Sequence, residues 1–164
     1  MSLSDDLLAQ ANRLTKLDPR RPQQANLRRA ISSSYYALFH EIAAAGAART
    51  SRSKPSDPAY QLAYRRFDHG TMREAAQAFI RQPEWIRALP GSIPPTIVEF
   101  SKSFVALQQE RHVSDYDPAR KYTRTEAREL VARSEGAIHE WRSVRLTSIG
   151  QYFLLVMLLG KPRS

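Results

Sequence analysis

The 164-residue sequence has no cysteine and only six glycines. Without cysteine it cannot form a disulfide, a thiolate zinc site or a cysteine nucleophile. The glycine-rich phosphate loop, the HExxH pair and the GxSxG elbow are also missing, which excludes the common signatures of nucleotide hydrolases, metalloproteases and serine hydrolases. The four histidines are scattered, so their spacing predicts neither a metal site nor a cofactor.

A long hydrophobic run is missing as well. The apolar stretch at residues 149–159 is far shorter than the roughly 20 residues that a membrane-spanning helix needs. We expect it to be a helix that docks onto the core or forms a dimer surface. A weak membrane-surface anchor that uses the basic tail at residues 161–163 is the alternative. Two acids precede any apolar run at the N-terminus, which argues against a secretory signal peptide and, with the lack of cysteine, favours a cytoplasmic location.

Positive charge dominates the composition, because 25 lysines and arginines against 16 acidic residues give a net charge of +9. This surplus favours an anionic partner such as RNA, a nucleotide or an acidic protein. Most of the cations are arginines, whose planar guanidinium group suits phosphate better than an ammonium group does. The length fits a single domain over residues 1–164 with a hydrophobic core of its own.

Apolar residues recur every three or four positions along most of the chain, which is the period of an amphipathic helix. The pattern predicts helices over residues 4–16, 24–48, 58–66, 71–82, from about 96 past 107, and 123–144. Residues 49–58 are polar and rich in proline, which predicts a mobile loop. Four prolines in residues 83–95 predict a connector without a helix, with Trp85 and Ile86 packed onto the core. Since no segment alternates with a period of two, we expect an all-α fold.

The helix over residues 24–48 should be central, because its apolar residues form one stripe. These are Ile31, Tyr35, Leu38, Ile42 and Ala45. Beside the stripe, Ser33, Tyr36 and His40 step by three and four, so that a hydroxyl, a phenol and an imidazole fall on one line. These groups would cradle a phosphate or a base; the alternative is that they make hydrogen bonds between helices inside the fold.

Two further positions stand out. On the helix that starts near residue 96, the apolar face continues through Phe104 and Leu107 to Arg111. Because burying an unpaired guanidinium is costly, Arg111 either pairs with Asp115, four residues later, or awaits a phosphate at a cleft. His69 precedes a glycine in a turn, where its imidazole would reach a ligand or stabilise the turn.

Two segments together resemble a known family. The sequence LRRAISSSYYALFH at residues 27–40 is similar to the RAYYAxFH helix of HEPN-domain proteins, and RHVSDY at residues 111–116 is similar to the RxxADY element of a small branch of that family. The resemblance covers about residues 5–145 and leaves 146–164 as an apolar helix and basic tail. It implies an up-and-down bundle of four to five main helices, frequently dimeric, with the arginine-bearing helix ends at a cleft.

The resemblance also implies a range of functions. Many HEPN proteins partner nucleotidyltransferases in toxin–antitoxin or defence loci, and some are metal-independent ribonucleases. In the ribonucleases an arginine holds the scissile phosphate, and a histidine four to six residues later assists proton transfer. Here the fifth residue after Arg111 is Tyr116, and the adjacent His112 points about 100° away around the helix. The histidine that the ribonuclease motif requires is therefore missing.

Three interpretations remain open. The first is an RNA- or nucleotide-binding module, homodimeric and partnered with a nucleotidyltransferase that would modify Tyr116. Its central residues would be Arg111, Asp115 and Tyr116, with Ser33, Tyr36, His40 and His69 as further phosphate contacts. The second is a metal-independent RNase toxin in which His112, His69 or His40 replaces the missing histidine. The third is a structural or oligomerisation module whose basic face is only solvated.

Overall fold

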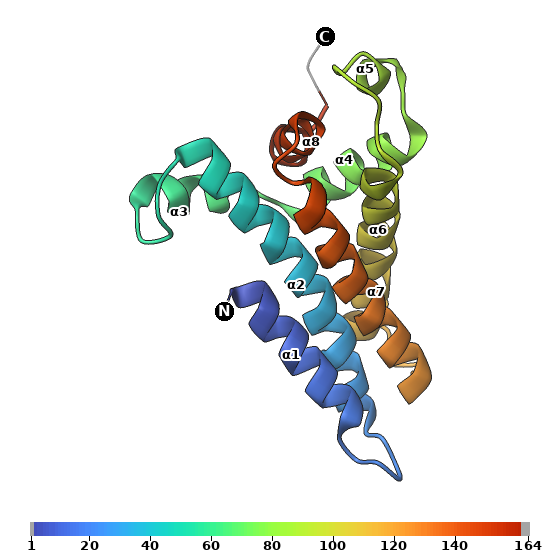
Figure 1. Ribbon diagram of the computed structural model, residues 1–164. Coiled ribbons are helices and arrows are strands. Elements are labelled where there is room, and N and C mark those ends of the chain that lie inside the picture. The colour runs from blue at the N-terminus through green and yellow to red at the C-terminus, as the bar shows by residue number, and fades with distance from the viewer. Residues whose placement is uncertain (1, 162–164) are drawn as a thin grey trace. The chain divides into compact units, whose positions relative to one another are not determined.

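The computed structural model describes residues 2–161 (Figure 1). Within these residues the chain forms eight helices and no strand, so the all-α prediction is confirmed. The helices are α1 (Leu3–Lys16), α2 (Gln24–Ser51), α3 (Pro58–Tyr64), α4 (His69–Arg81), α5 (Glu84–Arg87), α6 (Pro95–Tyr116), α7 (Arg124–Val144) and α8 (Ser148–Leu159). Among the same residues, no helix combines the length and the apolar character that crossing a bilayer requires.

The chain divides into two compact units. Unit 1 comprises Met1–His40 and Ser103–His139, and unit 2 comprises Glu41–Lys102 and Glu140–Ser164. Three helices, α2, α6 and α7, contribute residues to both units. A single domain over residues 1–164 stays a prediction. Of the predicted basic tail only Lys161 lies among the described residues.

Unit 1 is built from α1, the first part of α2, the last part of α6 and the first part of α7, and each segment runs opposite to the one before it (Figure 1). Three residues of the apolar stripe of α2 are fully buried in its core, Ile31, Tyr35 and Leu38, and the ring centroids of Tyr35 and Phe104 are 5.6 Å apart. The last two residues of the stripe, Ile42 and Ala45, belong to unit 2. Ala11, Ala30 and Val131 join α1, α2 and α7 in a second apolar cluster. Unit 1 is thus an up-and-down arrangement of four helical segments.

Unit 2 has an aromatic core to which α8 contributes. The ring centroid of Phe153 on α8 lies 4.9 Å from that of Phe79, 5.6 Å from that of Phe100 and 5.4 Å from that of Trp141. Met157 on the same helix is also fully buried. The apolar run at residues 149–159 therefore docks onto the core, which was the first of the three possibilities for it.

Capping side chains account for where several helices begin. α1 begins at Leu3 because Ser2 caps it: the Ser2 hydroxyl accepts a hydrogen bond of 3.2 Å from the backbone N–H of Asp5. A capping box starts α7: the backbone N–H of Thr123 donates to the Glu126 carboxylate at 2.7 Å, and the Thr123 hydroxyl accepts from the backbone N–H of Glu126 at 3.1 Å.

The connector at residues 83–95 differs from the prediction. It contains the single helical turn α5, which starts after Pro83. The expectation of a connector without a helix is wrong, because proline is tolerated just before the first turn of a helix. Ile86 in this turn is fully buried and Trp85 is half-buried, as packing onto the core requires.

Candidate functional site

A groove opens between α1 and α2 within unit 1, and we call it the α1–α2 groove. It encloses about 270 Å³. Its lining residues are Leu3, Leu7, Gln10, Arg29, Ser32, Ser33, Tyr36 and His40. Three of the predicted phosphate contacts, Ser33, Tyr36 and His40, therefore share one groove, as their spacing along a helix face predicts.

The polar side chains of the groove are ordered by contacts inside unit 1. The hydroxyl of Ser33 is buried and donates a hydrogen bond of 3.1 Å to Oε1 of Gln10. The rings of Tyr36 and His40 stack, with centroids 6.1 Å apart and planes inclined by 25°. Arg29 is exposed and makes no hydrogen bond or ion pair with any described residue. The groove thus has a cation available for an anionic ligand.

Arg111 borders this groove from α6. Its Nη2 donates a hydrogen bond to the Tyr36 hydroxyl, and its Nε lies 2.9 Å from Oδ2 of Asp115. The side chains of Arg111 and Asp115 are only 18% and 26% exposed. Asp115 also lies near a second groove residue, because the Ser32 hydroxyl is 3.4 Å from its Oδ2. Arg111 is therefore held by an internal ion pair that touches two residues of the groove.

The surroundings of Arg111 keep its guanidinium charged. Burial by itself lowers the pKa of Arg111, but the hydrogen bond with Tyr36 and the negative charge of Asp115 outweigh burial and raise that pKa above its ordinary value. A charged guanidinium with a carboxylate on one side can exchange that carboxylate for a phosphate, since both anions accept its N–H groups in the same planar geometry.

The other predicted residues lie outside the groove lining. Tyr116 is the last residue of α6 and is 66% exposed; its ring centroid lies 5.8 Å from the Arg111 guanidinium carbon and 5.0 Å from the centroid of the exposed His112. His69 belongs to unit 2, where it is the first residue of α4 after the capping Asp68. His69 is therefore not among the residues of the groove in unit 1.

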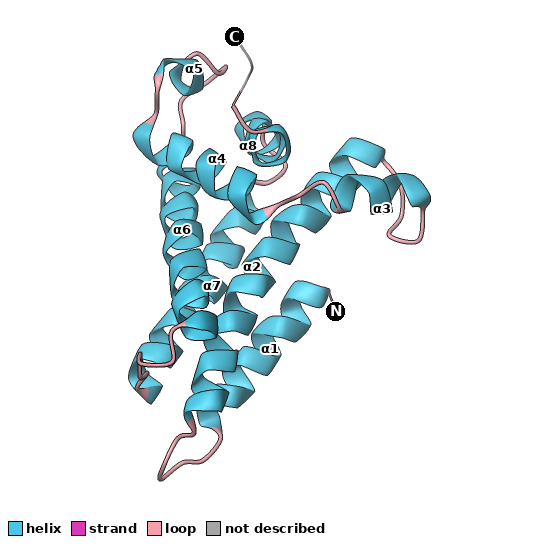
Figure 2. Cartoon of the chain, turned by 180° about the vertical axis from the view of Figure 1, so that it is seen from behind, coloured by secondary structure: helices cyan, strands magenta, loops and turns pink. Residues whose placement is uncertain are grey.

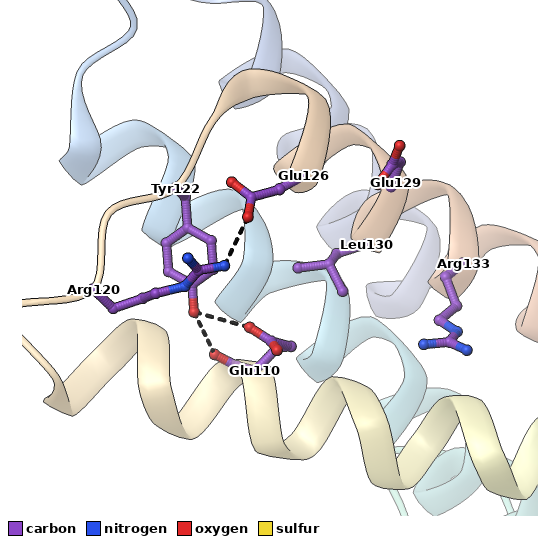
Figure 3. Close-up of a pocket in the computed structure, with 7 residues that line it drawn as sticks. All are labelled: Glu110, Arg120, Tyr122, Glu126, Glu129, Leu130 and Arg133. Carbon is purple, nitrogen blue, oxygen red and sulfur yellow. Dashed lines mark hydrogen bonds and ion pairs between the residues drawn. The ribbon is translucent and has the colours of Figure 1, made fainter.

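A second cavity of unit 1 lies beside Tyr122 and encloses about 340 Å³ (Figure 3). It is lined by Glu110, Arg120, Tyr122, Glu126, Glu129, Leu130 and Arg133. The Tyr122 hydroxyl donates to Oε2 of Glu110 at 3.0 Å, and Arg120 pairs with Glu126 at 2.7 Å while lying over the Tyr122 ring. Burial, reinforced by the hydrogen bond to Glu110, raises the pKa of Tyr122 to about 12.

This Tyr122 cavity is poorly suited to phosphate. Three carboxylates face two guanidinium groups, and one of those guanidinium groups, on Arg120, is already paired. The contacts of Figure 3 instead hold the loop before α7 in place, because Tyr122 of this loop contacts Glu110 on α6 and Arg120 of the same loop pairs with Glu126 on α7. We therefore place the candidate site at the α1–α2 groove and Arg111.

Two arginines that the sequence analysis missed bind backbone carbonyls at one end of unit 1. Arg28 on α2 donates to the carbonyls of Ser114 at 2.6 Å, of Asp117 at 2.7 Å and of Arg120. Arg124 on α7 donates to the carbonyls of Thr15, Leu17 and Asp18 at 3.2, 3.1 and 2.6 Å. Both satisfy carbonyls that the ends of α6 and α1 leave open. Since backbone acceptors have no sequence signature, no pattern pointed to these roles.

Comparison with known proteins found no relative of this chain. Neither a family model, a curated protein nor a solved structure matches the chain. The resemblance to HEPN proteins therefore rests on residues 27–40 and 111–116 alone. Among residues 2–161, no three histidine, aspartate or glutamate side chains are grouped so that they could hold a metal ion.

Proposed function

We propose that the chain is a HEPN-like module that binds RNA or nucleotide at the α1–α2 groove, with Arg111 as its phosphate contact. The contact between Arg111 and Tyr36 carries the proposal, because it joins a half-buried charged guanidinium to a residue that lines the groove. The exposed Arg29 lines the same groove and adds a second cation.

Binding would proceed by exchange of anions at Arg111. A phosphate oxygen replaces Asp115 on the guanidinium, while the stacked rings of Tyr36 and His40 offer an aromatic surface to a base. Asp115 thus competes with the ligand. Its removal should strengthen binding, whereas removal of Arg111 should weaken it.

The test compares the affinity of four proteins for ATP and for single-stranded RNA: wild type, Arg111→Ala, Asp115→Asn and Arg81→Ala. Arg81 is an exposed arginine of unit 2, so Arg81→Ala makes the same change in net charge far from the groove in sequence. Loss of a charge-assisted contact worth about 1.5–3 kcal/mol lowers affinity roughly tenfold or more for Arg111→Ala. Asp115→Asn should bind more tightly and Arg81→Ala like wild type. Equal affinity of Arg111→Ala and wild type would contradict the proposal.

A nucleotidyltransferase partner in a toxin–antitoxin or defence system is part of the same proposal, as is a homodimer. Tyr116 is the acceptor we propose for such an enzyme, because its phenol is exposed and lies near the Arg111 guanidinium. Transfer would join the nucleotide's α-phosphate to the phenol oxygen and release pyrophosphate. A nucleotidyltransferase co-expressed with the chain should raise its intact mass by one nucleotide, and Tyr116→Phe should abolish the increase.

One observation favours the second interpretation, a metal-independent ribonuclease. His40 stacks on Tyr36, the residue that Arg111 contacts, so an imidazole and a guanidinium flank the same phenol. In this mechanism Arg111 holds the scissile phosphate, and His40 takes the proton of the ribose 2′-hydroxyl as the 2′-oxygen attacks phosphorus. The bond from phosphorus to the 5′-oxygen breaks, and the 5′-oxygen leaves with a proton from water. Cleavage of RNA in EDTA that both His40→Ala and Arg111→Ala abolish would support it, and intact RNA would exclude it. If no RNA or nucleotide binds at low salt, the structural-module interpretation is favoured instead.

A further inference from the structure

Five cationic residues lie at, or within about one turn of, the end of unit 1 where α1 and α6 end and α2 and α7 begin. We call this set the basic end; it consists of Lys16, Arg20, Arg21, Lys121 and Arg128. All five are exposed, and none makes a hydrogen bond or ion pair with another described residue. The two loops that carry Arg20, Arg21 and Lys121 lie at the same end of unit 1 (Figure 2).

The carboxylates in these two loops already have other partners. Asp18 accepts a hydrogen bond of 2.8 Å from the side chain of Asn26. Asp117 accepts hydrogen bonds of 2.9 and 3.3 Å from the backbone N–H groups of Ala119 and Arg120. Neither forms an ion pair with the basic end, and the five cations of the basic end outnumber these two carboxylates.

The backbone that carries the basic end is held in place. The side chain of Gln24 donates to the Tyr122 carbonyl at 2.7 Å and accepts from the Tyr122 N–H at 2.9 Å, which joins the start of α2 to the loop before α7. Arg28 and Arg124 bind the neighbouring carbonyls as described above. Cations on a backbone that is already ordered lose less conformational entropy when they bind a ligand.

The basic end is connected to the α1–α2 groove along α2. This helix starts at Gln24, and the exposed Arg29 follows within two turns. At a rise of about 1.5 Å per residue, Tyr36 lies about 18 Å along the helix axis from Gln24. One nucleotide cannot span this distance. A stacked strand advances about 3.4 Å per nucleotide, so roughly five nucleotides would bridge the groove and the basic end.

We propose that the basic end is a second phosphate-binding surface, and that the ligand of unit 1 is an RNA strand that runs from the α1–α2 groove along α2 to this end. The inference rests on the proposed function, because it takes the groove as the first contact. RNA is favoured over an acidic protein because the groove, which lies further along α2, offers a stacked aromatic pair for a base. The Tyr122 cavity, with its three carboxylates, limits the surface on one side.

The experiment uses the full chain with two probes, ATP and a single-stranded oligouridine of about 12 nucleotides, which is long enough for both surfaces. The basic-end variant carries Lys16→Ala, Arg20→Ala, Arg21→Ala and Lys121→Ala. The control variant makes the same change in charge in unit 2, with Arg65→Ala, Arg66→Ala, Arg81→Ala and Arg87→Ala, all at exposed positions. Circular dichroism and thermal melting establish that each variant is folded.

The basic-end variant should bind oligouridine at least about tenfold more weakly and bind ATP like wild type. The slope of log K against log[salt] should become less negative by about 0.7 for each lost phosphate contact. If the basic-end variant binds oligouridine as tightly as the control variant does, the inference is overturned. The proposed function would still be supported in that case if Arg111→Ala weakens ATP binding. Conversely, if the basic-end variant binds oligouridine more weakly while Arg111→Ala binds both probes like wild type, the result contradicts the groove as a binding site and leaves the basic end as the phosphate-binding surface. Polyglutamate with the same total charge as the oligouridine serves as a competitor. If it displaces the oligouridine, the partner is an acidic protein and the RNA assignment is overturned.

Discussion

The guanidinium of Arg111 donates a hydrogen bond to the hydroxyl of Tyr36, which lies 75 residues earlier in the chain, and its central carbon is 5.1 Å from the centroid of the same ring. One tyrosine thus supplies both an acceptor and an aromatic surface to one arginine. Within unit 1 this contact joins the end of α6 to the middle of α2. It is also the contact through which Arg111 reaches the α1–α2 groove.

Tyr36→Phe separates the two roles of this tyrosine. The substitution keeps the ring and removes the acceptor, so a half-buried charged donor loses a partner, and we expect the free energy of unfolding to fall by about 1.5–3 kcal/mol. Urea denaturation measures this change. Tyr116→Phe is the matched control, because the exposed Tyr116 hydroxyl has no hydrogen-bond partner among the described residues. An equal loss in both variants would show that the Arg111 contact does not matter for stability.

The sequence could predict the parts of this site that depend on spacing along one helix. Ser33, Tyr36 and His40 share a groove because residues three and four apart lie on one helix face. Arg111 and Asp115 pair for the same reason. The contact between Arg111 and Tyr36 could not be predicted, because it depends on how two helices pack, and no local pattern specifies that.

The same limit applies to the fold. The helices were predictable from apolar residues such as Phe100, Phe104 and Leu107, which are fully buried as their periodicity requires. The one-turn helix α5 was not, because four residues are too few to show a period. The carbonyl-binding roles of Arg28 and Arg124 were also missed, since on sequence alone both look like ordinary surface cations of a basic chain.

Arg28→Lys tests the importance of one such arginine. A lysine has a single ammonium group and cannot reach the three carbonyls that the fork of Arg28 contacts, so carbonyls near the end of α6 lose their donor. We expect a loss of stability of about 1–3 kcal/mol and faster hydrogen exchange in residues 114–123. Arg29→Lys, at the adjacent exposed position, should leave both unchanged. A loop that exchanges no faster in Arg28→Lys would contradict the assignment.

Glu126 should make stability depend on pH in the acid range. Hydrogen bonds from the backbone N–H and the hydroxyl of Thr123, followed by the contact with Arg120, lower the pKa of Glu126 from 4.5 to about 2. Because the folded state lowers this pKa, the stabilisation is complete above pH 4.5 and is lost as the pH falls from 4.5 towards 2. Urea unfolding over this range should show a flatter pH dependence for Glu126→Gln than for wild type. Glu129→Gln should keep the slope of wild type; if it flattens the curve as much, Glu126 is not the group responsible.

Replacing Gly150 or Gly136 by alanine should change the stability of the protein in opposite directions. A Cβ atom on Gly150 would lie 2.2 Å from the Val144 carbonyl oxygen and 3.0 Å from Cα of Arg145, so the backbone between α7 and α8 would have to move. Gly136 in α7 is exposed and a Cβ there would meet nothing within 4 Å. We expect Gly150→Ala to destabilise the protein by about 1–3 kcal/mol and Gly136→Ala to stabilise it by about 0.5–1 kcal/mol. Thermal melting followed by circular dichroism measures both, and a higher melting temperature for Gly150→Ala would show that α8 does not start against the end of α7 as described.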